Sequence, residues 1–212
     1  MAGANLRDAA SLIIYRHQQN RLQALMGKRS DQAKFAPGIY VFPGGNIETE
    51  DGKIHTAPGF NTSGLSARAA KKLPLLALTA IRETWEETGL MVAQKGQQLQ
   101  ASGTSWDAFS NLGLSPAPHR LEYLGRAITP TYSSTRFHAR FFATEWKNCE
   151  GEIQSDGELS NIRWVDITNP ENLPMYDVTE YMLDQLNSML NAQTTKNLVV
   201  SYRLNETLLR YE

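Results

Sequence analysis

Three carboxylates lie within five residues of this sequence, at Glu83, Glu86 and Glu87. On a helix that turns 100° per residue, they fall inside one arc of roughly 100°. Neighbouring carboxylates repel one another and weaken a helix by a few tenths of a kcal/mol per pair. A hard divalent cation reverses that repulsion, because Mg²⁺ and Mn²⁺ prefer oxygen ligands. The group therefore predicts either a solvated acidic helix face or a site for Mg²⁺ or Mn²⁺.

Arg82 and Gly89 stand on either side of the carboxylates. Arg82 lies one turn before Glu86, close enough to neutralise part of the charge. Gly89 is suited to the left-handed position just past a helix end, where other residues meet a Cβ penalty. The pattern predicts a helix over residues 73–88, with Pro74 in its first turn.

A glycine-rich turn, Phe42-Pro43-Gly44-Gly45, precedes this helix in the chain. Together the two stretches resemble the Nudix box, which runs Gly, five residues, Glu, seven residues, and then Arg-Glu-aliphatic-x-Glu-Glu-x-Gly-aliphatic. Arg82 follows Gly45 by 37 positions instead of the family's 14, so about 23 residues are inserted. Thr84 takes a slot that is aliphatic in the family. The first glutamate of the box has its nearest counterparts in Asp51, Glu48 and Glu50, which leaves the partner of Arg82 open.

The resemblance implies a catalytic group of Arg82, Glu83, Glu86 and Glu87. It implies Glu83 and Glu87 as metal ligands, with Glu86 as a further ligand or a group that handles water. The backbone carbonyl of Gly45 can add another ligand. Arg82 is similar to the residue that orients the glutamates in the family.

A metal site of this kind bridges phosphate oxygens and generates hydroxide from bound water near neutral pH. The reaction that fits is hydrolysis of a diphosphate linkage by direct attack of water, since the sequence offers no activated serine or cysteine nucleophile. The general base varies within the family. Three residues of a late acidic loop are candidates, against the alternative that they are solvated loop charges: Glu152, Asp156 and Glu158.

A second motif lies upstream of the glycine turn. Leu25-Met26-Gly27-Lys28-Arg29-Ser30, followed at fixed spacing by Lys34, Gly38 and Phe42, resembles the signature of the Nudix coenzyme A diphosphatases. The insertion inside the box is similar to that of the mammalian peroxisomal branch and its bacterial relatives. Lys34 stands where the family has an arginine. A lysine keeps the positive charge but cannot make the paired hydrogen bonds to a phosphate that a guanidinium makes. The resemblance implies that Arg29, Lys34 and Phe42 bind substrate.

The implied substrate is coenzyme A or an acyl-coenzyme A, cut to adenosine 3′,5′-bisphosphate and a 4′-phosphopantetheine. Two alternatives stay open. One keeps the chemistry and changes the substrate to ADP-ribose, NADH or a related nucleotide. The other is a Nudix-fold module that senses a nucleotide without cutting it, although such a module has no chemical need for a metal cluster.

Length and composition favour one domain. With 212 residues, 41% of them hydrophobic, the chain can bury one substantial core over residues 1–212. Residues 48–72 are predicted to be an insertion with little regular structure, and 175–212 a helix–strand extension. The alternation of elements predicts an α/β fold, and the resemblance implies a Nudix-type α/β/α sandwich with a mixed sheet between helices.

The remaining expectations concern partners and location. A net charge of −1 gives no electrostatic case for nucleic-acid binding. Apolar runs are too short to span a membrane, and a single cysteine fits a reducing, cytoplasmic compartment. The expected partner is a small nucleoside diphosphate derivative, and a homodimer is the assembly to test. Strands are predicted at 9–16, 21–28, 39–42, 121–129, 136–143, 159–165 and 197–204, and helices at 105–112, with Ser105 as its cap, and 178–190.

Overall fold

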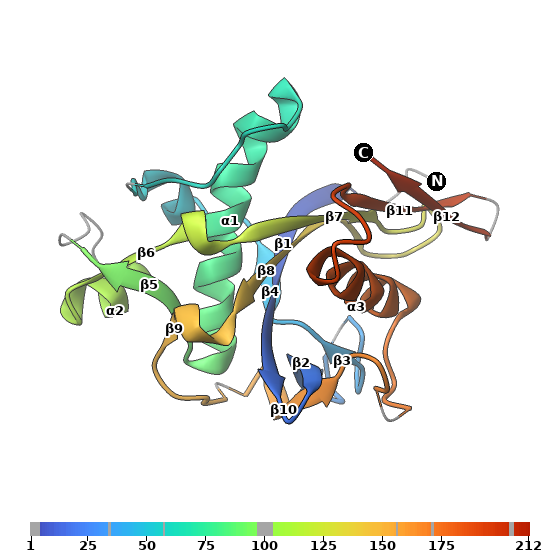
Figure 1. Ribbon diagram of the computed structural model, residues 1–212, viewed down its shortest axis with the longest axis horizontal. Helices are drawn as coiled ribbons and strands as arrows, with labels where there is room; N and C mark the ends of the chain where they lie inside the picture. The colour runs from blue at the N-terminus through green and yellow to red at the C-terminus, as the bar shows by residue number, and fades with distance from the viewer. Residues whose placement is uncertain are drawn as a thin grey trace.

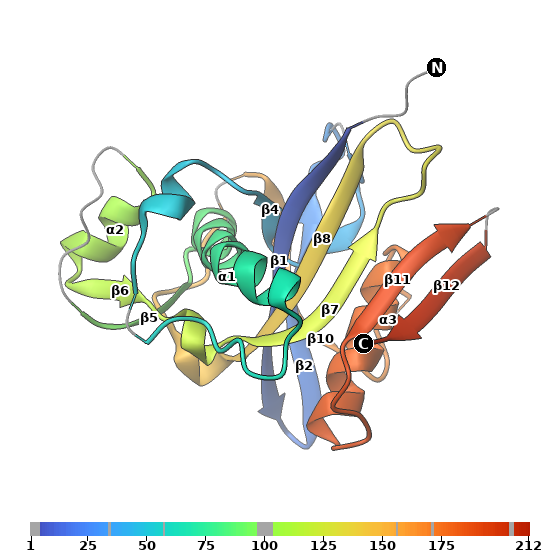
Figure 2. The ribbon, with the colours of Figure 1, turned by 90° about the horizontal axis from the view of Figure 1, so that it is seen from above.

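The computed structural model describes residues 5–33, 35–56, 58–96, 104–155, 157–170, 172–203 and 206–212. Within those ranges the main feature is a nine-stranded mixed sheet. Helix α1 (Ala67–Thr88) covers one face of this sheet and α3 (Asp177–Leu190) covers the other (Figures 1 and 2). The predicted α/β/α sandwich is confirmed.

The main sheet follows the order β10-β2-β1-β8-β7-β11-β12, with β3 paired to β2 and β4 paired to β1. Strands β1 and β8 are parallel, as are β7 and β11, and the other pairs are antiparallel. The strands are β1 (Leu6–Gln18), β2 (Arg21–Arg29), β3 (Tyr40–Val41), β4 (Gly44–Asn46), β7 (Glu122–Ile128), β8 (Arg136–Glu145), β10 (Leu159–Asp166), β11 (Leu198–Arg203) and β12 (Glu206–Tyr211).

Strand β1 lies at the centre and divides the core in two. Its residues Leu12, Ile13 and Ile14 are fully buried, as predicted for a strand covered on both faces. Because side chains alternate along a strand, Leu12 and Ile14 pack on the α1 side, whereas Ile13 packs against Met182 of α3. The apolar side chains along one face of α3, in the region predicted to be the last helix, contribute to this second core.

A smaller sheet lies beyond the C-terminal end of α1 and has the order β6-β5-β9. Gly89 ends α1 in the left-handed conformation, as predicted, with φ at 72°. This turn leads the chain directly into β5. The elements of this region are β5 (Met91–Lys95), α2 (Trp106–Asn111), β6 (Leu114–Pro116), the 3₁₀ helices η2 (Pro118–Arg120) and η3 (Trp146–Asn148), and β9 (Cys149–Glu150).

The predicted insertion has more structure than expected. Its first part forms a 3₁₀ helix, η1 (Glu50–Lys53), and Ile54 and Phe60 are buried in the core. Helix α1 begins at Ala67, not at residue 73, so Pro74 lies inside it. The missed signals are Ser66, whose hydroxyl accepts the N3 amide hydrogen, and the run of alanine, arginine and lysine that follows, all strong helix formers.

Most predicted strands are confirmed with ends shifted by a few residues, whereas β4, β5, β6, β9 and β12 were not predicted. The predicted extension contains α3, β11 and β12, and this hairpin continues the main sheet beside β7. Within the described ranges, no helix combines the length and the apolar character needed to cross a membrane.

Candidate active site

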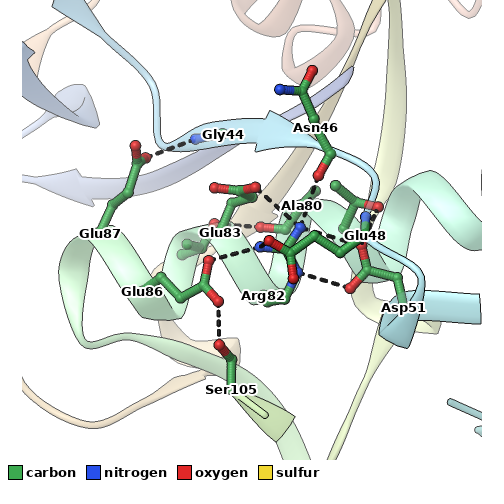
Figure 3. A network of polar contacts seen from close by, with 12 residues as sticks. Gly44, Asn46, Glu48, Asp51, Ala80, Arg82, Glu83, Glu86, Glu87 and Ser105 are labelled. Atoms are coloured by element: carbon green, nitrogen blue, oxygen red, sulfur yellow. Dashed lines mark hydrogen bonds and ion pairs between the residues drawn. The ribbon is translucent and has the colours of Figure 1, made fainter. Parts of the chain in front are cut away.

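The glycine turn and the acidic helix meet, as the sequence predicts. The Gly44 amide donates to Oε2 of Glu87 at 2.8 Å (Figure 3). A Cβ on Gly45 would lie 2.5 Å from Oε1 of Glu83, and one on Gly44 would lie 2.4 Å from the carbonyl oxygen of Ala10. Gly44 is therefore needed for β4 to fit against the backbone of β1, and a side chain at Gly45 would displace the Glu83 carboxylate.

Arg82 is buried beside the turn and holds its neighbours in place (Figure 3). Its Nη2 donates to the carbonyl oxygen of Asn46 at 2.8 Å and lies 3.0 Å from Oε1 of Glu83. Its Nη1 donates to Oε2 of Glu86 at 2.7 Å. Despite burial, the bond to Asp51 and the nearby carboxylates raise the pKa of Arg82 further, so it stays charged. Arg82 therefore contacts the turn and two of the carboxylates at once, and its role in orienting them stays a prediction.

Asp51 is the partner of Arg82 that the sequence left open among three acids. It is fully buried, and its Oδ1 accepts from Nε of Arg82 at 2.8 Å. Its Oδ2 accepts from the Thr79 hydroxyl at 2.8 Å and the Glu48 amide at 3.0 Å. The Glu48 side chain stays largely exposed, and Glu50 pairs with a lysine of its own 3₁₀ helix. Asp51 thus takes the place of the first glutamate of the box.

Glu86 differs from the other two carboxylates of the helix. Its carboxylate bonds to Arg82 and to the hydroxyl of Ser105, on the side away from Gly44 and Glu87 (Figure 3). Ser105 was predicted to cap α2, but its hydroxyl makes no cap hydrogen bond and bonds Glu86 instead. The structure therefore brings Glu83 and Glu87 to the glycine turn and leaves Glu86 outside that pair.

The two carboxylates at the turn are in an environment that penalises negative charge. Burial raises the pKa of Glu83 to about 7, with Arg82 opposing the shift and Glu86 adding to it. Burial likewise raises the pKa of Glu87 to about 8, against the hydrogen bond from Gly44. Glu87 is only 2% exposed, which excludes the alternative of a solvated acidic face for this residue.

A hard cation fits this pair of oxygen donors, because Mg²⁺ is commonly held by one or two carboxylates and keeps several waters. Among the residues that the structure describes, no three His, Cys, Asp or Glu side chains already form a metal site. The donor set that fits is therefore Glu83, Glu87 and a backbone oxygen of the glycine turn, completed by water.

A cleft of about 710 Å³ opens beside the pair. The predicted substrate residue Arg29 lines it, and so do Glu83, Gly45 and Glu158. The charge of Arg29 lowers the pKa of Glu87 and that of Glu158 raises it, so both side chains are close enough to act on this carboxylate. Arg29 and Glu158 therefore face the acidic end of the cleft.

The other predicted residues are placed differently. Phe42 borders the cleft but is mostly core, because it is buried with its ring edge-on to Phe141 at 6.5 Å. Glu152 is exposed and does not line the cleft. Lys34 and Asp156 lie outside the described residues. Apart from Phe42, sequence reasoning missed the aromatic side chains that line the cleft, for which no spacing gave a signal.

Known proteins support one family for this architecture. No family model matches the chain. A Caenorhabditis elegans protein named "Putative nudix hydrolase 7" is 28% identical over an alignment of 171 residues that covers 76% of this chain. The alignment covers 51% of that protein, so the chain spans about half the length of the curated relative it matches. A NUDIX hydrolase from Alicyclobacillus acidocaldarius is 25% identical, with a TM-score of 0.71 over 91% of this chain and 98% of that one.

This chain has the Nudix fold. The NUDIX domain of Shewanella oneidensis NrtR, solved with ADP ribose, shares the fold at 14% identity and a TM-score of 0.51, covering 88% of this chain and 89% of that one. The two relatives named above are Nudix hydrolases by name, and this chain is similar to both. In the stretch that resembles the Nudix box, Asp51 stands at the first acidic position and the long segment before α1 lies inside the motif.

Proposed function

We propose that this protein is a Nudix hydrolase that uses a divalent metal ion to cleave the diphosphate linkage of a nucleoside diphosphate derivative. The observation that carries this proposal is the pair of carboxylates against the glycine turn: Glu87 is buried, and Glu83 is largely buried and lines the end of an open cleft. Buried carboxylates with raised pKa values are typical of functional sites, because burial costs energy that a purely structural role does not repay.

Each residue of the site has a distinct part in the proposed reaction. Glu83, Glu87 and the carbonyl of Gly45 would hold Mg²⁺ or Mn²⁺, with Glu86 nearby on the same helix. When bound, such an ion neutralises phosphate charge and supplies hydroxide from water near neutral pH. Arg82 keeps the carboxylates oriented through its bonds to Asp51 and the turn. Among the three candidate bases, Glu158 is favoured because it lines the cleft.

Coenzyme A or an acyl-coenzyme A is the first substrate candidate. Its support is the motif that precedes the glycine turn, together with the position of Arg29 in the cleft. A guanidinium there can donate hydrogen bonds to phosphate oxygens of a bound diphosphate. The proposed products are adenosine 3′,5′-bisphosphate and a 4′-phosphopantetheine.

ADP-ribose, NADH or a related nucleotide is the second candidate. It is favoured by one specific observation: a domain of the same fold binds ADP ribose in the crystal. The charge of the cleft agrees, because among its described lining residues Arg29 is the single lysine or arginine, and coenzyme A carries a third phosphate. A nucleotide sensor without catalysis is the third reading. The buried acidic pair speaks against it, since a binder needs no such pair.

A panel assay tests the proposal and ranks the substrates. The protein is incubated with Mg²⁺ or Mn²⁺ and with coenzyme A, acetyl-coenzyme A, ADP-ribose, NADH and a dinucleoside polyphosphate, and products are identified by mass. We expect cleavage at a phosphorus anhydride that stops in EDTA. Preference for ADP-ribose would replace the first substrate by the second. Inertness toward the whole panel would contradict the enzyme and favour the sensor.

A further inference from the structure

The cleft has a second end that the proposed hydrolysis does not use. We call it the aromatic end, and its residues come from separate segments of the chain: Phe35, Tyr132, Phe137, Tyr176 and Tyr202. In the sheet, Phe137 pairs with Arg7, four residues along β1 from Ser11, which pairs with Gly44. At about 3.3 Å per residue, this separates Phe137 from the glycine turn by roughly 13 Å along the strand. The aromatic end and the acidic pair are therefore at two ends of one cleft.

Three of these rings pack into a wall. The ring centroid of Phe35 lies 5.2 Å from that of Phe137, edge-on, and 6.1 Å from that of Tyr176. Tyr176 nevertheless keeps 41% of its surface exposed, and Tyr132 keeps 71%. Large rings that line a cleft and stay in contact with water offer apolar area that a flat ligand can cover.

The Tyr176 side of the wall is fixed from two directions. On one side, the Tyr40 amide of β3 donates to the carbonyl of Pro174 at 2.8 Å. On the other, the Asp177 carboxylate accepts from the hydroxyl of Tyr202 at 2.8 Å and from a threonine hydroxyl of β12 at 3.1 Å. The hairpin of β11 and β12 thus ties down the start of α3. A surface held in this way loses little conformational entropy when a ligand binds.

Arg29 connects the wall with the acidic end. Its Nε donates to the carbonyl of Phe35 at 3.1 Å, and its charge acts on Glu87. The guanidinium thus bonds the backbone of the ring wall and is close enough to the acidic pair for its charge to act there. A ligand with a ring at one end and phosphates at the other would place its phosphates near this cation.

We propose that the aromatic end binds the nucleobase of the substrate, stacked on the wall of Phe35, Phe137 and Tyr176. This rests on the proposed function, because it assumes that the diphosphate lies at the acidic pair. A base fits better than an acyl or pantetheine chain, since it has a flat π-face for the rings. Asp177, which also lines the cleft, has remaining lone pairs to accept an N–H of the base or an O–H of the sugar.

The test measures binding of AMP, ribose 5-phosphate and 4′-phosphopantetheine by calorimetry, each with Mg²⁺ and again with EDTA. None of the three contains an anhydride, so binding is read without hydrolysis. Wild-type protein should bind AMP about tenfold more tightly than ribose 5-phosphate, because base–aromatic stacking has about that effect. Tyr176→Ala should remove this advantage, and Tyr176→Phe should keep it.

Tyr211→Ala is the matched control, because Tyr211 is 57% exposed on β12 and does not line the cleft. We expect it to bind all three ligands as the wild type does. The proposal is overturned if AMP binds no more tightly than ribose 5-phosphate or if Tyr176→Ala leaves the affinity for AMP unchanged. It is also overturned if Tyr176→Ala weakens the binding of 4′-phosphopantetheine alone. A protein that binds AMP through Tyr176 but cleaves nothing in the panel would keep this inference and defeat the proposed function.

Discussion

The two ends of the cleft are built in opposite ways. At the acidic end, the carboxylates come from one helix and meet one turn, and Arg82 and Asp51 behind them are buried with hydrogen bonds between them. At the aromatic end, rings from separate loops and strands gather, and two of them stay exposed. The acidic end has one arrangement that satisfies its charges, whereas the aromatic end can accommodate flat groups of different shape. Reaction chemistry tolerates little displacement, while recognition by stacking tolerates more.

The largest expected effect on stability comes from disrupting the acidic end of the cleft. Asp51→Ala leaves the guanidinium of Arg82 buried without its main counter-charge, which costs about 3–5 kcal/mol of unfolding free energy. Urea denaturation followed by circular dichroism measures it. Glu50→Ala is the control, because its surface pair with Lys53 should contribute about 1 kcal/mol or less. Equal losses in both variants would mean that the buried ion pair does not hold the acidic end together.

Glu87→Gln should lower turnover at least about 100-fold, since even residues behind a metal ligand change activity by about 10–100-fold. The fold should be kept, because the amide removes a charge and almost no volume. Initial rates on the best substrate of the panel, with Mg²⁺, measure the effect. Glu86→Gln should lose less, since Glu86 faces Ser105 and not the glycine turn. Wild-type rates in Glu87→Gln would show that the acidic pair is not the reactive end.

Stability without metal should depend on pH in a direction set by the acidic pair. The pKa values of Glu83 and Glu87 are raised to about 7 and about 8, above the ordinary 4.5 of an unfolded glutamate. Between pH 5 and 8 the folded state therefore holds more protons than the unfolded state, so stability falls as pH rises. In EDTA the melting temperature should drop across this window, by about 2–4 °C for each kcal/mol lost.

Two further measurements complete that prediction. Glu83→Gln/Glu87→Gln should flatten the pH dependence between pH 5 and 8, because neither amide titrates there. Mg²⁺ should reduce the slope in the wild type, since a bound cation stabilises the charged carboxylates. A melting temperature that rises from pH 5 to 8 in EDTA would contradict the assignment of the pair as carboxylates whose negative charge is disfavoured in the folded state.

The smallest expected effect concerns the third carboxylate. Ser105→Ala removes the hydroxyl that donates a hydrogen bond to Glu86. Because the Glu86 side chain is about a quarter exposed, a water molecule can replace that hydrogen bond. We expect a loss of about 0.5–1.5 kcal/mol in unfolding free energy and little change in turnover. Thermal melts and rates measure the two. A loss of activity as large as that of Glu87→Gln would place Glu86 among the working carboxylates after all.

The sequence predicted the acidic end well because its residues are close in the chain or fixed by backbone geometry. The spacing of Glu83 and Glu87, the glycines that admit them and the cap at Gly89 all follow from local rules. Glu86 lies on the same side of the helix as Glu83 and Glu87. The direction of its carboxylate, however, depends on a hydrogen bond from Ser105, and helical periodicity does not reveal such a contact with a distant residue. Asp51 is six positions after Gly45, where the Nudix box has its first glutamate, so its position could be predicted. Its burial could not, because that depends on how the insertion packs.

The aromatic end could not be predicted for a related reason. Phe35, Phe137 and Tyr176 are far apart in the sequence, and each reads as an ordinary core or loop residue. They meet only because β1 pairs with β8 and because the segment before α3 is bonded to β3. Such contacts are set by tertiary pairing, which a single sequence does not reveal.

The parallel pairing of β1 with β8 also sets an order of events during folding. Leu12 on β1 stands opposite Phe142, 130 positions later, so the central strand has no neighbour on that side until the second half of the chain exists. Contacts between such distant residues close slowly, and an unpaired apolar edge invites association with other chains. We expect a fragment ending before β8 to carry every residue of the box and still aggregate. The residues of the proposed metal site thus lie in the first half of the chain, whereas the central strand beside them completes its pairing only with the second half.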